Sequence, residues 1–257
     1  MEKGKNPKRK VPVSALGDSF LGYAPRIEEV LLAVERALAS QRLWERPHSI
    51  PLAGLDSDER ELLLGILGEG TAVVDVSGDA GQTSMATMLS GVWFTEKNGG
   101  TDDVVYTIDV GVLPAFAFAR IANLPALALP HSSPASESVA ASALLQELEE
   151  KQRAWEREGT AGEINLQLHA LLPRDFEMLT AFLGQAPVIV WIGGHCRWWL
   201  LATRWRDLWR IEVRAPAGKK EASLLEIGRY PSVLTLPSSA FAVGARRVRR
   251  LLQLYGE

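Results

Sequence analysis

The chain repeats part of its own sequence, and this repeat limits the folds that it can adopt. When the sequence is shifted by 116 positions, residues 50–93 align without a gap on residues 166–209. Eleven of these aligned pairs are identical, among them Leu52 with Leu168, Gly68 with Gly184 and Trp93 with Trp209, whereas ordinary residue frequencies give about three. With one inserted residue, residues 108–114 also match residues 225–231. We therefore predict a unit of about 65 residues that occurs twice.

Each copy predicts the same order of elements. A short extended segment (50–55 or 166–171) precedes a helix that ends at Gly68 or Gly184, where a left-handed C-cap is expected. Strands rich in β-branched residues follow, at residues 71–76, 91–95 and 103–110 in the first copy and 187–192, 207–213 and 222–227 in the second. Gly99-Gly100 and Ala217-Gly218 are expected to form hairpin turns. We predict an α+β fold of two tandem similar units, each a helix packed on a small, mainly antiparallel sheet.

Additional helices are expected at both ends of the chain and in the linker. Apolar residues recur at helical spacing in residues 25–42, along a narrow stripe in residues 137–158, and after Ser239. The predicted organisation is a basic flexible tail (1–24), an N-terminal helix with the first unit (25–121), a linker with a long helix (122–160), and the second unit with a C-terminal helix (161–257).

The charge, the apolar runs and the cysteine and histidine content together exclude several classes of partner and site. The chain has 28 basic and 31 acidic residues, a net charge of −3, so nucleic-acid binding is not expected. It contains no uncharged apolar run of about 18 residues, so no direct membrane insertion is expected. Its single cysteine, Cys196, excludes an intramolecular disulfide and suits a cytoplasmic location. The four histidines are scattered, so we expect no complete structural zinc site and no cofactor.

Several short motifs resemble those of a known family, the hydrogenase operon proteins HyaF and HupH. In the first copy these are Leu67-Gly68-Glu69-Gly70, then Gly91-Val92-Trp93, then Ile108-Asp109-Val110-Gly111 with Pro114. In the second copy they are Leu183-Gly184 with Pro187, then Cys196-Arg197, Arg206-Asp207-Leu208-Trp209 and Leu225-Glu226-Ile227. One turn departs from the family's Gly-Tyr-Gly-Asn-Cys pattern, because the run here is Gly193-Gly194-His195-Cys196.

The resemblance implies a role in the maturation of a membrane-bound uptake [NiFe] hydrogenase. Members of this family are regarded as accessory chaperones of the hydrogenase small subunit, acting before its export while its iron–sulfur clusters are assembled or protected. The resemblance therefore implies a non-enzymatic, cytoplasmic protein whose partners are the small-subunit precursor and other maturation proteins.

The two copies differ most at the glycine turn and in the strand after it. Asp79-Ala80 in the first copy becomes His195-Cys196 in the second, next to Arg197. A thiol beside an imidazole and a guanidinium is expected to have a lowered pKa and to be partly thiolate, able to ligate iron or to pair with a partner's cysteine. The alternative is that Cys196 is a small buried apolar side chain.

Tryptophan is concentrated in the second copy. Five of the eight tryptophans lie between residues 191 and 209, interleaved with arginines, and both residue types are enriched in protein interfaces. Trp209 corresponds to Trp93 and is expected in the core. Strand alternation would point Trp198 and Trp199 to opposite faces. Core packing, a partner-binding face and base stacking are the open interpretations. The predicted partner-binding residues are His195, Cys196, Arg197, Trp198, Trp199 and Trp205.

Three functions remain open on the sequence. The first is a chaperone that binds through its second unit. The second is a redox or iron-handling protein that uses Cys196 as a thiolate, although one cysteine cannot hold a cluster alone. The third is a structural adaptor of unrelated function. The sequence contains no GxGxxG or phosphate-binding loop, and no Ser–His–Asp arrangement suggests itself, so an enzyme is not predicted.

Overall fold

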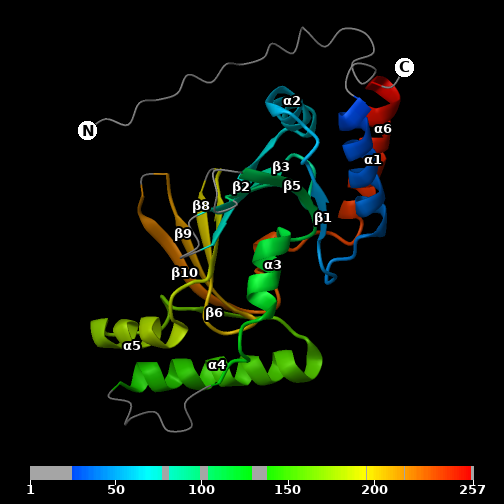
Figure 1. The fold of residues 1–257 in the computed structure, drawn as a ribbon. Coiled ribbons are helices and arrows are strands. Elements are labelled where there is room, and N and C mark those ends of the chain that lie inside the picture. Colours follow the sequence, from blue (N-terminus) through cyan, green and yellow to red (C-terminus); the bar gives the residue numbers. More distant parts are fainter. Residues whose placement is uncertain are drawn as a thin grey trace, which may run out of the picture.

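The computed structural model describes residues 25–76, 81–98, 104–128, 138–194, 196–216 and 218–255. Within these ranges, ten strands form a single antiparallel sheet that is surrounded by helices (Figure 1). The predicted α+β class and antiparallel pairing are confirmed. The predicted basic tail (1–24), the Gly99-Gly100 turn, Ala217 and His195 lie outside the described residues.

The strands follow the order β1-β5-β4-β3-β2-β7-β8-β9-β10-β6 across the sheet. The first half of the sheet consists of β1 (His48–Pro51), β2 (Glu69–Val76), β3 (Gln82–Thr87), β4 (Val92–Asn98) and β5 (Val104–Val110). The second half consists of β6 (Gly162–Asn165), β7 (Val188–Ile192), β8 (Arg197–Ala202), β9 (Leu208–Arg214) and β10 (Lys220–Ile227). Strands β3, β6 and β8 were not among the predicted elements.

The two halves meet where β2 pairs with β7. Val74 lies opposite Val190, and these residues are the pair that the sequence shift of 116 aligns. On either side, Ala72 lies opposite Ile192 and Val76 lies opposite Val188, so the pairing is symmetric about this point. The prediction of a separate small sheet for each unit is wrong. Separate sheets would leave β2 and β7 as edge strands, whereas joining them pairs their backbone groups.

One predicted segment of the repeat is displaced along the sequence. The backbone N–H of Leu52 donates to the carbonyl of Tyr106 over 2.9 Å, and that of Leu166 donates to Ser223 over 2.9 Å. Leu52 and Leu166 are both buried, whereas Leu168 is exposed. The predicted extended segment 166–171 is therefore wrong: the strand ends at Asn165, and Leu166 rather than Leu168 takes the place of Leu52.

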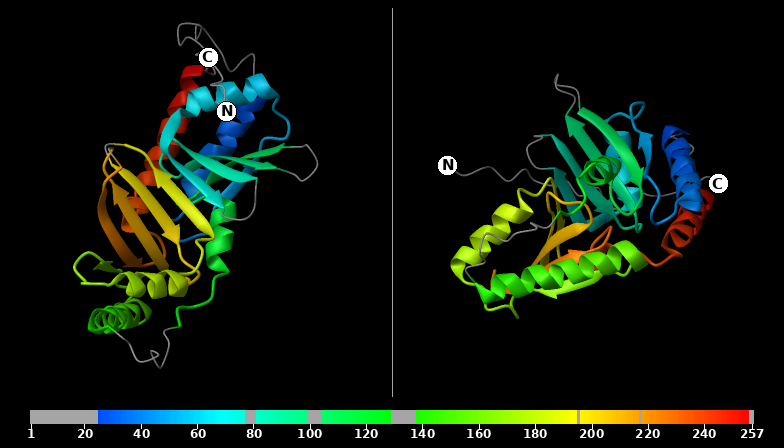
Figure 2. Two further views of the ribbon diagram at one scale, coloured as in Figure 1. Left: turned by 90° about the vertical axis from the view of Figure 1, so that its left-hand side faces the viewer. Right: turned by 90° about the horizontal axis from the view of Figure 1, so that it is seen from below.

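Most helices lie at the periphery of the sheet. Helices α1 (Pro25–Ser40) and α6 (Ala240–Tyr255) run side by side in opposite directions, and α1 contacts β1 and β5 (Figure 1). Helix α4 (Val139–Glu158) contacts β6 and β10, with α5 (Pro173–Leu183) beside it (Figure 2). Their apolar residues form a second core, which includes Leu148, Leu183 and Leu225.

Helix α2 (Ser57–Leu67) begins as its sequence predicts. The Asp56 side chain accepts from the backbone N–H of Glu59 over 2.9 Å, and the Glu59 side chain accepts from the N–H of Asp56 over 2.9 Å, which forms a capping box. The predicted left-handed C-cap is correct in φ but wrong in ψ. Gly68 has φ 70° but ψ 153°, and Gly184 has φ 69° and ψ −173°, so each glycine turns the chain directly into a strand.

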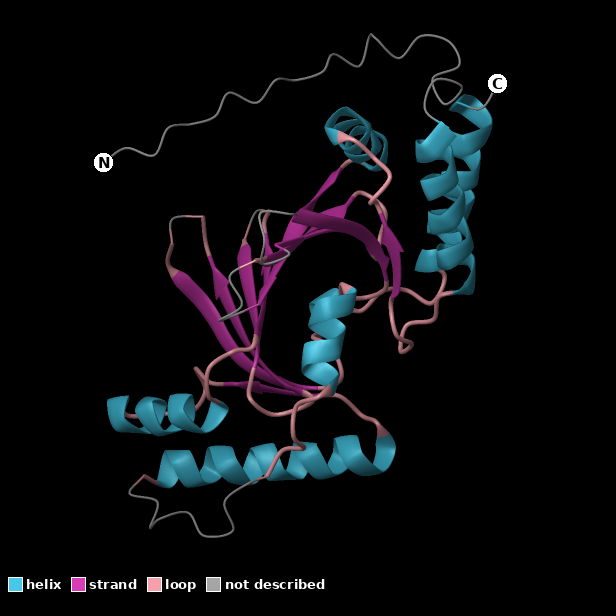
Figure 3. Ribbon diagram, in the orientation of Figure 1, coloured by secondary structure: helices cyan, strands magenta, loops and turns pink. Residues whose placement is uncertain are grey.

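Helix α3 (Ala115–Ala122) lies in the hollow of the curved sheet and contacts β2 and β7 (Figure 3). The buried carboxylate of Asp109 fixes its start, accepting from the N–H of Ala115 over 3.1 Å and from Thr95 Oγ1 over 2.8 Å. Glu226 accepts from the N–H of Ser232 in the same way over 2.6 Å, at the start of a short 3-10 helix, η3 (Ser232–Leu234). None of the described helices is both long and apolar enough for a membrane crossing.

Candidate functional site

Part of the convex side of the sheet is not covered by helices. Figure 2 (left) looks onto this side of β8, β9 and β10, with α4 and α5 below the strands and α2 above them. Four side chains of this open area are linked to one another, and we call them the tryptophan face: Trp191, Trp199, Glu212 and Arg214. They come from three neighbouring strands, β7, β8 and β9.

The two tryptophans form a cross-strand pair. Trp191 lies opposite Trp199 in the β7–β8 register, and their rings meet edge to face, with centroids 5.3 Å apart and planes at 84°. This geometry suits the charge distribution of aromatic rings. Trp191 is 38% exposed, which is unusual for a large apolar side chain in the middle of a sheet. The pair therefore presents a rigid aromatic surface to the solvent.

A buried carboxylate fixes the arginines beside these rings. Glu212, which lies opposite Trp199 in the β8–β9 register, is only 8% exposed. It accepts from Arg210 Nη2 over 2.7 Å and from Arg214 Nη2 over 3.2 Å. The guanidinium carbon of Arg214 lies 3.8 Å from the centroid of the Trp199 ring, within cation–π range. The two tryptophan rings and the Arg214 guanidinium are thus already arranged by contacts within the chain, before a partner protein binds.

The predicted partner-binding residues do not all lie on this face. Trp199 lies there, and strand alternation places the exposed Arg197, which is opposite Arg214, on the same side. Trp198 lies on the other side of the sheet, packed against the main core. Trp205 instead packs against the second core, and its indole N–H donates to the carbonyl of Phe182 over 2.9 Å, next to α5. The predicted cluster is therefore divided among three places.

Cys196 does not have the surroundings that were predicted for a reactive thiolate. Its Sγ donates to Glu221 Oε2 over 3.4 Å, and its side chain packs partly against the main core. The hydrogen bond to Glu221 raises the pKa of the Cys196 thiol above its ordinary value, and burial and the charge of Glu221 act in the same direction. The prediction of a lowered pKa is therefore wrong, because the acidic neighbour opposes ionisation. His195 lies outside the described residues.

Three of the four residues of the tryptophan face were not among the predicted partner-binding residues. Trp191 was noted only as part of the tryptophan-rich segment, and Glu212 and Arg214 were not singled out. The spacing of the charged residues along β9 could have indicated Glu212 and Arg214, since the side chains at 210, 212 and 214 point to one side of a strand. Only the register of three strands brings them to Trp191 and Trp199.

No metal centre is evident in the part of the chain that the structure describes, where no three His, Cys, Asp or Glu side chains are grouped to hold an ion.

Comparisons with known proteins point to one family. Residues 138–255 match the "HupH hydrogenase expression protein, C-terminal conserved region". The chain is similar to the hydrogenase expression/formation protein HupQ of Azotobacter chroococcum mcd 1, with 28% identity over 86% of this chain and 79% of that protein. It is also similar to HupH of Rhodobacter capsulatus, with 27% identity over 80% of this chain and 73% of that protein.

One solved structure is also similar, that of the hydrogenase expression protein HupH from Thiobacillus denitrificans ATCC 25259. It shares 28% identity and covers 44% of this chain and 93% of that chain, with a TM-score of 0.38.

Proposed function

The chain belongs to the HupH family of hydrogenase expression proteins, and from this we propose that it acts in hydrogenase maturation as an accessory chaperone. Its partner in this proposal is the precursor of the small subunit of an uptake [NiFe] hydrogenase. It binds the precursor while the iron–sulfur clusters are assembled or protected, before export. It does this in the cytoplasm, without catalysing a reaction of its own, and with other maturation proteins as further partners.

One observation carries the binding role: the partly exposed Trp191–Trp199 pair beside Arg214. Tryptophan and arginine dominate the residues whose truncation costs most in protein interfaces. The part of the Trp191 ring that folding leaves exposed can be buried against a partner. Because Arg197, Arg210 and Arg214 outnumber Glu212, we expect the partner surface to be apolar with acidic groups around it.

We further propose that the two halves derive from one duplicated unit, of which only the second carries the partner surface. Recurring hydrogen bonds support this. Thr87 Oγ1 accepts from the N–H of Leu89 over 3.2 Å, and Thr203 Oγ1 accepts from the N–H of Trp205 over 3.1 Å. Superposition of the two halves in an experimental structure tests this directly.

The binding role is tested by capture of the precursor. The tagged full chain is mixed with the small-subunit precursor under reducing, anaerobic conditions, and the retained precursor is measured. Trp191→Ala is expected to weaken the affinity by about 2 kcal/mol or more, roughly thirtyfold, as for other central aromatic contacts. Failure of the unaltered chain to retain any precursor would count against the whole proposal.

A matched control separates the tryptophan face from general surface apolarity. Phe176, on α5, is an aromatic side chain exposed to 39%, nearly the same fraction as Trp191. Phe176→Ala is expected to retain the precursor as the unaltered chain does. If Phe176→Ala and Trp191→Ala weaken retention equally, the tryptophan face is not the binding site.

The thiol alternative is tested in the same assay. Cys196→Ala is expected to leave both precursor capture and hydrogenase maturation unchanged, because the contact with Glu221 disfavours a thiolate. Loss of maturation with normal capture would instead assign a chemical role to the sulfur.

A further inference from the structure

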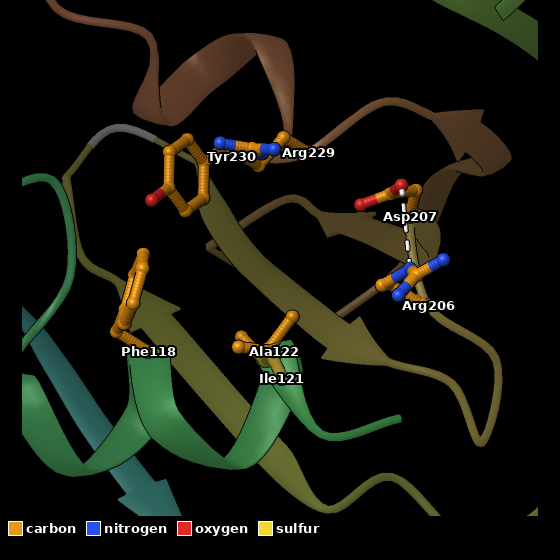
Figure 4. A pocket seen from close by; sticks show the side chains of 7 residues that line it. All are labelled: Phe118, Ile121, Ala122, Arg206, Asp207, Arg229 and Tyr230. Atoms are coloured by element: carbon orange, nitrogen blue, oxygen red, sulfur yellow. Dashed lines mark ion pairs between the residues drawn. The ribbon is translucent and has the colours of Figure 1, made fainter. Parts of the chain in front are cut away.

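A pocket of about 440 Å³ lies beside α3, away from the tryptophan face (Figure 4). Its apolar wall comes from α3, and its polar side comes from two turns at the ends of β9 and β10. The residues that line it are Phe118, Ile121, Ala122, Arg206, Asp207, Arg229 and Tyr230. An apolar wall facing a few convergent polar groups is the usual composition of a binding site.

The corresponding place in the first half of the molecule is filled. The N–H of Gly111 donates to the carbonyl of Gly91, and the N–H of Gly228 donates to that of Asp207, so Gly91 and Asp207 occupy equivalent turns. A Cβ on Gly91 would lie 2.5 Å from the ring of Phe241 and 3.2 Å from Leu236. Two apolar side chains thus close the first site, whereas the second stays open.

Asp207 holds a backbone conformation that favours glycine. Its φ of 61° is positive, which costs a non-glycine residue about 1 kcal/mol. Its carboxylate accepts from Trp155 Nε1 over 3.2 Å and lies 4.0 Å from Arg206 Nε. Strained residues of this kind occur preferentially at functional sites. Here the side chain lies next to Arg206 at the pocket.

The pocket has an excess of positive charge. Arg206 and Arg229 line it together with the single carboxylate of Asp207. Arg229 donates from Nη1 to the carbonyl of Trp44 over 3.3 Å. The Trp44 ring in turn stacks on Tyr230, with centroids 5.7 Å apart and planes at 5°. Arg229 is therefore held at the pocket by its own neighbours.

Tyr230 supplies a neutral donor. The residue is only 8% exposed, and among the described residues no group forms a hydrogen bond with its hydroxyl. Burial raises the pKa of Tyr230 to about 12, so the hydroxyl keeps its proton at physiological pH. Figure 4 shows the ring standing over Phe118, with the hydroxyl on the side turned toward α3. A hydroxyl donor in this position is suited to an acceptor oxygen within the pocket.

We propose that this pocket binds a side-chain carboxylate of a partner polypeptide together with the bulky apolar side chain next to it. The apolar side chain packs against Phe118 and Ile121. The carboxylate accepts from Arg229 and from the Tyr230 hydroxyl, and Arg206 adds charge at the rim. Guanidinium–carboxylate pairs are the strong, geometrically selective hydrogen bonds that such recognition needs.

The test uses two short peptides, acetyl-Ala-Phe-Glu-Ala-amide and the same peptide with Gln in place of Glu. Binding to the ¹⁵N-labelled full chain is followed by the indole N–H signals of Trp44 and Trp155, which contact Tyr230 and Asp207. The Glu peptide is expected to shift both signals and to bind about tenfold more tightly than the Gln peptide. Equal affinities would overturn the proposal.

Variants of the pocket locate the binding. Arg229→Gln is expected to weaken the Glu peptide about tenfold and to remove its advantage over the Gln peptide. Ala122→Leu fills the pocket from an exposed position on α3, and Ala119→Leu, on the same helix but outside the lining, is its control. Ala122→Leu should abolish the shifts and Ala119→Leu should not. Unchanged binding in Ala122→Leu would overturn the proposal, as would loss in both variants.

This site is independent of the tryptophan face. Trp191→Ala is expected to bind the Glu peptide with unchanged affinity, because Trp191 does not line the pocket. The pocket can therefore fail while precursor capture succeeds, and the reverse.

Discussion

The two halves of the sheet place different chemistry at equivalent positions on either side of the β2–β7 pair. In the first half, Thr83 Oγ1 donates to Asp75 Oδ1 over 2.8 Å across β2 and β3. In the second half, the positions 116 residues later hold Trp191 and Trp199, packed edge to face across β7 and β8. The same backbone frame therefore supports a small polar pair on one side and a large aromatic pair on the other.

The difference continues into the next strand. Glu96 in β4 is exposed, whereas its counterpart Glu212 in β9 is buried against Arg210 and Arg214. In the second half, a buried carboxylate and two partly buried arginines thus lie next to a partly exposed aromatic pair. The proposed binding role assigns the partner surface to the second half, and the comparison of the two halves provides the tests below.

The largest expected change in stability comes from the two equivalent turns, at Gly91 and Asp207. Gly91→Ala is expected to lower the free energy of unfolding by about 3 kcal/mol, because the new Cβ would meet Phe241 at 2.5 Å and φ is 75°. Asp207→Gly at the equivalent turn is expected to change it by less than about 1 kcal/mol, since the backbone is relieved while the acceptor of Trp155 is lost. Urea unfolding of both variants measures this. Equal effects would mean that the turns are not equivalent.

The next largest change in stability is expected at the equivalent glutamates, Glu212 and Glu96. Glu212→Ala is expected to lower the free energy of unfolding by about 2–3 kcal/mol, because it leaves two partly buried guanidiniums without their carboxylate. The value is below that of a fully buried pair, since Arg210 and Arg214 are partly solvated. Glu96→Ala is the matched control and should change stability by less than about 0.5 kcal/mol. Urea unfolding at neutral pH tests both, and similar losses would contradict the asymmetry.

A smaller loss of stability is expected when the first-half pair, Asp75 and Thr83, is transferred to the equivalent positions of the second half. The double variant Trp191→Asp, Trp199→Thr gives β7 and β8 the pair that β2 and β3 carry. It is expected to cost about 1–2 kcal/mol of stability through the lost ring contact and apolar burial. Its retention of precursor should fall at least about tenfold, because the aromatic contacts are gone. Normal retention by the folded double variant would place the binding surface elsewhere.

The smallest effect is a pH dependence at the end of β10. Burial raises the pKa of Glu226 above its ordinary value, opposed by the hydrogen bonds from Ser232 and aided by the charge of Glu163. Because the folded state then binds the proton more tightly than the unfolded state, Glu226 lowers stability as pH rises from about 4.5 through the raised pKa. Glu226→Gln should remove this part of the decline, as thermal unfolding from pH 4 to 7 would show. If the melting temperatures of Glu226→Gln and the unaltered chain changed in parallel with pH, a raised pKa of Glu226 would be excluded.

Much of the local structure followed from local sequence. Helices α1, α4 and α6 begin and end within a few residues of the predicted bounds, because each has an apolar stripe at helical spacing. The strands β2, β5, β7 and β10 were predicted from their β-branched residues. Strands β3 and β8 were missed, because neither segment alternates strictly between apolar and polar residues.

The candidate site was predicted only in part. The sequence placed it in the second half and identified Trp199 and Arg197, because tryptophan and arginine are concentrated there. It also grouped Trp198, Trp205 and Cys196 with them, which the fold separates. Neighbours along a strand alternate between faces, so closeness in sequence does not give a common surface.

The sequence by itself predicted a repeated unit, and it determined where most helices run and which half is rich in tryptophan and arginine. These properties depend on residue identity and on spacing within single elements. Only the tertiary structure decided that β2 joins β7, that Trp191 meets Trp199 beside Arg214, and that a pocket stays open next to Asp207. Each of these depends on the register between strands or helices that are distant in the chain, and such register is fixed by long-range packing rather than by local pattern.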